Sequence, residues 1–171
     1  MNPVQICKKV LGDDKLSAIL EQLSSSQIKQ VLKEGGLKVK LSGGFVSQKK
    51  KRTVWSKKIS GAIDEENEDA AAELLQQWLL NHHRGMLVDY LDALGVTHRD
   101  GETDQSFLLG SAKEKVHDAA RMLLDSTERD AVDVKAYLLY IAYQQRSPVF
   151  EDFEPLAQWA APDPNAEQQA Q

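Results

Sequence analysis

Residues 71–94 read AAELLQQWLLNHHRGMLVDYLDAL and carry the clearest helical pattern of the chain. Apolar side chains recur three or four residues apart from Ala71 through Trp78 to Leu94, which predicts an amphipathic helical stripe. Gly95 follows the last apolar residue and is a typical helix stop. Gly85 predicts a kink or a break, because a glycine inside a helix costs ~1 kcal/mol relative to alanine. This stretch indicates a mainly α fold.

The chain continues with further helical patterns on the C-terminal side. Residues 111–124 begin with a serine and a glutamate spaced as in a capping box, and residues 130–142 begin with an aspartate that can cap a helix. Helices with one apolar face and short connections favour antiparallel packing. We therefore predict an acidic, antiparallel helical bundle over residues 63–160, followed by a disordered tail over residues 161–171.

The N-terminal part has a different pattern. Three short helices are expected within residues 4–34, where apolar residues recur at helical spacing and glycines follow. Residues 37–41 alternate apolar and basic side chains, and a Ser-Gly-Gly turn leads to Phe45 and Val46, which could begin a return strand. This pattern favours a short β-hairpin. Residues 49–63 are rich in lysine and resemble a mobile cationic connector. The predicted organisation is thus a small basic helical module over residues 1–62 that ends in a cationic linker, with the boundary near Gly61.

Charge is divided unequally between the two parts. Residues 1–60 carry 13 Lys/Arg and 4 Asp/Glu, a net charge of +9, whereas residues 61–171 carry 8 and 22, a net charge of −14. Such a division is typical of a basic module that is directed at a polyanion. The alternative is that the basic and acidic parts attract and dock on each other, because opposite potentials also stabilise contacts within a chain.

The basic segment is the feature with a positive mechanism. A dense group of cations can displace the counterions condensed on a phosphate backbone, which gives salt-sensitive and largely sequence-independent binding. Trp55, which lies among the cations, could stack on a base or anchor the segment to the bundle. No base-reading residue can be named, so DNA and RNA both stay open as partners. The candidate nucleic-acid-binding residues are Lys38, Lys40, Lys49, Lys50, Lys51, Arg52, Trp55, Lys57 and Lys58.

Enzymatic chemistry has no sequence support, so we expect a non-enzymatic protein with no catalytic residues, no metal, no cofactor and no small-molecule substrate. Nucleophile-elbow, P-loop and dinucleotide-binding patterns do not occur in the sequence. Glu114 and His117 match the Glu-x-x-His spacing of di-iron bundles, but a second copy does not occur, so a surface pair is the preferred interpretation. His82 falls on the apolar stripe and is interpreted as a core histidine, the alternative being a pH-sensitive switch.

The second functional hypothesis is a helical protein-interaction adaptor. Tyr140 and Tyr143 fall outside the apolar stripe of their helix and are therefore expected to stay exposed. Exposed aromatic side chains are typical anchors of protein interfaces. The competing interpretation is that the last helix packs over them.

Location is inferred from what the sequence lacks. The first residues have no apolar core and cleavage site of a secretory signal, and the single cysteine, Cys7, suits a reducing compartment. No stretch approaches the ~20 apolar residues that span a bilayer, so no membrane partner is expected. The predicted location is the cytoplasm.

Overall fold

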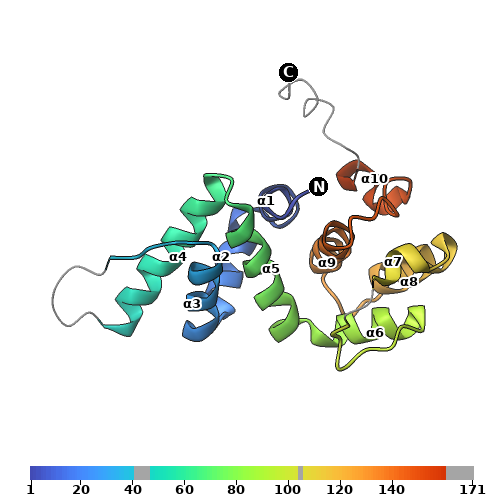
Figure 1. Cartoon of the computed structure of the whole chain (residues 1–171), viewed down its shortest axis with the longest axis horizontal. Coiled ribbons are helices and arrows are strands. Elements are labelled where there is room, and N and C mark those ends of the chain that lie inside the picture. The colour runs from blue at the N-terminus through green and yellow to red at the C-terminus, as the bar shows by residue number, and fades with distance from the viewer. Residues whose placement is uncertain (41–46, 104–105, 161–171) are drawn as a thin grey trace, which may run out of the picture. The chain divides into compact units, whose positions relative to one another are not determined.

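The computed structural model describes residues 1–40, 47–103 and 106–160, and these are mainly helical, without a β-strand (Figure 1). The mainly α prediction is therefore confirmed. The chain divides into two compact units, which we call the N-terminal unit, Pro3–His82, and the C-terminal unit, His83–Gln171 grouped with Met1–Asn2. None of the described helices combines the length and the apolarity that crossing a bilayer requires.

Two sequence predictions fall wholly or partly outside the described residues. The proposed hairpin covered residues 37–46, of which residues 41–46 are not described and residues 37–40 do not form a strand. The proposed disordered tail, residues 161–171, is likewise not described.

The N-terminal unit begins with short helices that follow the predicted apolar spacing. Ser24 caps the last of them: its hydroxyl accepts from the Gln27 backbone N–H at 3.3 Å, and the Gln27 side chain accepts from the Ser24 N–H at 2.6 Å. This reciprocal capping box satisfies two backbone donors that a helix start leaves open. The elements are α1 (Pro3–Gln5), the π-helix η1 (Ile6–Leu11), α2 (Gly12–Gln22) and α3 (Ser25–Glu34).

Helix α4 (Gln48–Asp64) replaces the predicted mobile connector, and that prediction was wrong. Its four buried side chains, Trp55, Ile59, Ala62 and Ile63, recur at helical spacing and form the inward face. The lysines between them concealed this stripe. Since α4 packs against α2, α3 and the next helix, α5 (Glu68–His82), the segment is part of a core rather than a linker.

The division between the units therefore lies at His82, later than the predicted boundary near residue 62. Helix α5 packs closely against α3, and Gly35 makes this approach possible. A Cβ atom on Gly35 would lie 2.7 Å from the Cβ of Ala70. Asn67 links Gly35 to α5 at this contact, because its side-chain amide donates to the Gly35 carbonyl at 3.1 Å and accepts from the Ala70 N–H at 2.9 Å.

The C-terminal unit starts where the long stripe breaks. The break falls at His83, whose backbone leaves the helical region (φ −127°, ψ 23°), and not at Gly85, which is helical. His82 is exposed at the end of α5, so its interpretation as a core histidine was wrong. His83 instead points its Nε2 at a carboxylate oxygen of buried Asp133, 3.5 Å away. The elements are α6 (Arg84–Leu94), α7 (Phe107–Gly110), α8 (Lys113–Leu124), α9 (Ala131–Gln144) and α10 (Glu154–Ala160).

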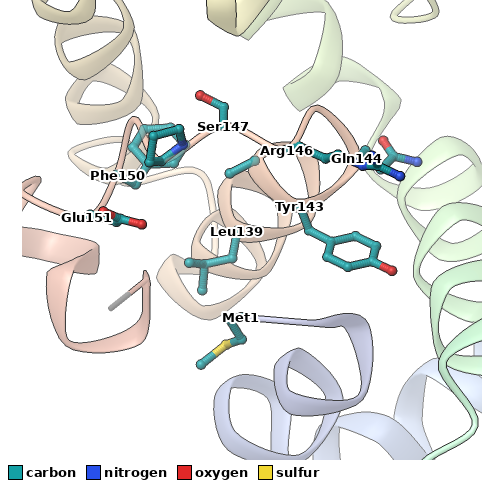
Figure 2. A pocket seen from close by; sticks show the side chains of 10 residues that line it. Met1, Leu139, Tyr143, Gln144, Arg146, Ser147, Phe150 and Glu151 are labelled. Atoms are coloured by element: carbon teal, nitrogen blue, oxygen red, sulfur yellow. The ribbon is translucent and has the colours of Figure 1, made fainter. Parts of the chain in front are cut away.

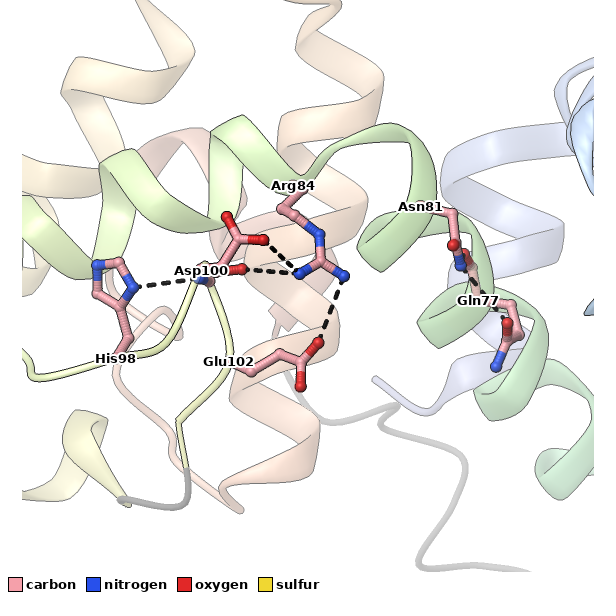
Figure 3. Close-up of polar contacts among 7 residues, drawn as sticks. Gln77, Asn81, Arg84, His98, Asp100 and Glu102 are labelled. Carbon is pink, nitrogen blue, oxygen red and sulfur yellow. Dashed lines mark hydrogen bonds and ion pairs between the residues drawn. The ribbon is translucent and has the colours of Figure 1, made fainter.

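A tight turn follows α6 in the polar loop that the sequence predicted. Asp100 and Gly101 both have positive φ, 54° and 86°, and the backbones of residues 99 and 102 exchange hydrogen bonds of 2.8 and 3.1 Å. Figure 3 shows how Arg84 holds this turn, with its guanidinium donating to the Asp100 carboxylate at 2.8 Å and to Glu102 at 3.4 Å. Two successive positive φ values are typical of Asp-Gly in a two-residue turn.

Candidate nucleic-acid interface on helix α4

The lysines of α4 surround its outer side. Successive residues of an α-helix are about 100° apart, so Lys50 and Lys57 share one direction, opposite the buried stripe. Lys49 and Lys58 lie about 90° to either side of that direction. All four side chains are exposed, and Lys51 is partly exposed near the Lys58 side. We call these five residues the lysine face.

The lysine face lacks a paired carboxylate within the part of the chain that the structure describes. Among the described residues, no carboxylate lies within ion-pair distance of any of these five ammonium groups. Lysines elsewhere differ: Lys8 lies 2.7 Å from Glu66, and Lys113 pairs with Asp152. The Lys113 hydrogen bond and charge lower the pKa of the Asp152 carboxyl. The five lysines of the lysine face are therefore not neutralised in this way by any described residue, and their charge is available to an anionic partner.

Arg52 takes a structural role that the sequence did not reveal. Its Nη2 donates to the carbonyl oxygens of Leu20 at 3.1 Å, Glu21 at 2.5 Å and Leu23. These carbonyls end helix α2, where the macrodipole places partial negative charge and backbone acceptors lack helical partners. Arg52 therefore caps α2 and ties α4 to it, and its guanidinium is committed within the protein.

Trp55 also lies inside. It is 7% exposed, and the ammonium of Lys29 on α3 lies 5.5 Å from its ring centroid, a cation–π contact. Of the two roles expected for Trp55, anchoring is the one that its burial supports, since a buried ring is not presented to a base. Lys29 itself is exposed beside α4 and was not among the predicted residues. Only the packing of α3 on α4 distinguishes it from other surface lysines.

The two remaining candidates, Lys38 and Lys40, are exposed in the irregular segment that follows α3. They belong to the same unit as α4, but they do not share its helix. The structure thus places five of the nine predicted residues on one helix, four of them exposed around its outer side and Lys51 partly exposed at the edge of its buried stripe. It assigns two, Arg52 and Trp55, to packing.

His117 has a structural role in the C-terminal unit. His117 was interpreted as a surface residue, but its side chain is only 12% exposed, and its ring lies 4.8 Å from Phe153 and 6.3 Å from Phe150. Its Nε2 lies 2.7 Å from the Val149 carbonyl oxygen, a hydrogen bond that holds the segment before α10 against α8. Within the described ranges, no group of three or more His, Cys, Asp or Glu side chains is arranged to hold a metal ion.

A pocket of about 770 Å³ lies at the end of α9 in the C-terminal unit. Figure 2 shows Leu139, Tyr143 and Phe150 among its lining residues, together with Met1. The lining mixes apolar side chains with amide, hydroxyl and oppositely charged groups, so its chemistry does not select one ligand class.

The aromatic residues of the adaptor hypothesis separate in the structure. Tyr140 is buried and its hydroxyl accepts from the Gln144 side chain at 3.0 Å, whereas Tyr143 is 37% exposed. The expectation of exposure thus holds for Tyr143 and was wrong for Tyr140.

Comparison of the chain with protein-family models, with curated proteins and with solved structures found no match.

Proposed function

We propose that this protein binds nucleic acid without catalysing a reaction, through the lysine face of α4, with Lys38 and Lys40 as outlying contacts. The observation that supports the proposal most is that four exposed lysines surround the outer side of one helix, with Lys51 at its edge. None of the five has a carboxylate partner among the described residues. Phosphate oxygens are the counter-charge that such a surface suits, and their neutralisation releases condensed counterions.

Rigidity strengthens this proposal over that of a cationic tail. Helix α4 is fixed by the buried side chains of Trp55 and Ile59 and by the Arg52 cap on α2. Phosphate binding therefore has to order only lysine side chains and not the backbone, whose ordering costs ~1–2 kcal/mol per residue. A folded helix also holds its cations at constant spacing, with Lys50 and Lys57 separated by about 10 Å along the axis.

The test is fluorescence anisotropy of labelled DNA and RNA titrated with the full chain across a salt series. The double variant K50A/K57A removes two cations from the centre of the face, and K9A/K33A removes two exposed lysines elsewhere in the same unit. We expect K50A/K57A to reduce the steepness of log affinity against log salt by about 2, because each lost phosphate contact removes ~0.9. The control should change it by less than half as much.

Full-length protein is the correct material for this test. A fragment that ends near residue 62 would lack α5, which packs on both α3 and α4. If neither nucleic acid binds at low salt, or if both double variants lose affinity equally, the proposal fails.

The second candidate is the protein-interaction adaptor, which is favoured by exposed apolar side chains in the C-terminal unit. Leu109 is 66% exposed, Met122 is 47% exposed, and Tyr143 keeps part of its ring at the surface. Light scattering across a concentration series tests self-association. A constant monomer mass, together with no partner recovered by the wild type over a Leu109→Ser control, would refute this candidate.

A further inference from the structure

We infer that the nucleic acid taken by α4 is double-stranded B-form DNA, with the helix lying in the major groove and its flanking lysines on the two phosphate backbones. This inference rests on the proposed function and narrows it to one class of polymer.

The first argument is the distribution of charge around α4. Lys49 lies on one flank of the outer side, Lys58 on the other with Lys51 behind it, and Lys50 and Lys57 lie between them. A helix that lies in a groove has phosphates on both sides, so cations on both flanks of the helix can contact them. A single strand offers one line of phosphates and would leave one flank without a partner.

The second argument is size. An α-helix with its side chains is about 10–12 Å across, and the major groove of B-DNA is about 12 Å wide, so the groove admits one helix. The major groove of A-form RNA is deep and narrow and does not accept such an element. The geometry of the lysine face therefore favours duplex DNA over duplex RNA.

The third argument concerns Trp55 and Arg52, two side chains of α4 of the kinds that commonly contact bases. Binding of single strands relies on aromatic stacking, and Trp55 lies under Lys29 with 7% of its surface exposed. Arginine and lysine both contact guanine edges, but the guanidinium of Arg52 is committed to the end of α2, so only lysines remain for that role. Beside Lys50 and Lys57 the outer side holds exposed Thr53 and Val54; Val54 has no hydrogen-bonding group, and the Thr53 hydroxyl donates to the Lys49 carbonyl at 3.1 Å. The face therefore favours contact with the phosphate backbone of the DNA, with little selection among base sequences.

The experiment compares one labelled duplex DNA, its single strand and the duplex RNA of the same sequence, each titrated with the full chain at low salt. We expect the duplex DNA to bind about tenfold or more tightly than the other two. The flank variant K49A/K58A should lose duplex-DNA affinity as strongly as K50A/K57A, and K9A/K33A should lose much less. A duplex with bulky C5 substituents on its pyrimidines should bind more weakly, because these fill the major groove.

The outcomes separate the two claims. Equal or tighter binding of single-stranded DNA or duplex RNA that still depends on the α4 lysines overturns the duplex-DNA inference and leaves the proposed function standing. Insensitivity to major-groove substituents overturns the docking mode. Failure of all three polymers to bind overturns both the inference and the function on which it rests.

Discussion

Replacing Arg52 with alanine separates the structural cations of α4 from those proposed to bind. In the sequence Arg52 is indistinguishable from the lysines around it, but in the structure its Nη2 faces three carbonyl oxygens at the end of α2. We therefore expect Arg52→Ala to lower the free energy of unfolding while leaving the nucleic-acid affinity of the folded protein nearly unchanged.

The expected loss in the free energy of unfolding follows from the number of hydrogen bonds that the Arg52 guanidinium can donate. One nitrogen with two hydrogens serves three acceptors, so the arrangement counts as about two charge-assisted hydrogen bonds, each ~1.5–3 kcal/mol. Glu21 is exposed, so water can partly replace the lost donor there, whereas Leu20 and Leu23 are buried residues. We expect a loss of about 2–4 kcal/mol from the free energy of unfolding. Arg52→Lys should lose about half of this, because a single ammonium lacks the planar fork.

Urea-induced unfolding measures the effect. Circular dichroism reports helix content, and tryptophan fluorescence reports buried Trp55 and Trp78 of the N-terminal unit together with Trp159 of the C-terminal unit. Lys50→Ala is the matched control. It removes from the same helix one cation whose ammonium group has no hydrogen-bond partner in the described part of the chain. Its free energy of unfolding should change by less than about 0.5 kcal/mol.

Either of two results would refute this reasoning. One is an Arg52→Ala variant as stable as the wild type. The other is a folded Arg52→Ala variant that loses affinity as strongly as K50A/K57A, since that would place the guanidinium at the phosphates.

Three further predictions concern packing and protonation. Gly35→Ala should cost about 1–3 kcal/mol by urea unfolding, because its Cβ would lie 2.7 Å from that of Ala70, and an unchanged stability would contradict the close packing. Gly101→Ala should cost about 1–3 kcal/mol, because φ is +86° and its Cβ would meet the Leu87 Cβ at 3.0 Å; Gly110→Ala, with open space around it, is the control. Burial raises the pKa of Cys7 from 9.0 to about 12, so the unfolded state loses this proton first and stability should fall as pH rises through that interval. Cys7→Ala should remove this part of the pH dependence, and identical unfolding curves at pH 8 and pH 10 for both proteins would refute the assignment.

Local patterns predicted the helices whose faces are simple. The predicted N-cap of α9 was correct, since the Asp130 carboxylate accepts from the Val132 N–H at 2.8 Å. The expected capping box at Ser111 did not form: α8 begins after Ala112 without a side-chain cap. Caps of this kind differ by ~1 kcal/mol or less, so tertiary packing readily selects another start.

Helix α4 was missed for a different reason. Only the residues that face α2, α3 and α5 need to be apolar, and four buried residues among many cations resemble a solvated connector. The role of Arg52 depends on carbonyls about thirty positions earlier in the chain, and that of Lys29 depends on the packing of α3 on α4. Such long-range contacts leave no periodic signal in a single sequence.

The ends of the early helices depend on residues that are synthesised later. The last carbonyls of α2 receive Arg52, and the Gly35 carbonyl beyond α3 receives Asn67. A nascent chain that stops before residue 67 therefore has open acceptors and an uncovered apolar surface on α3. The N-terminal unit should consequently become protected from protease on the ribosome in one step, when α5 emerges, and not helix by helix.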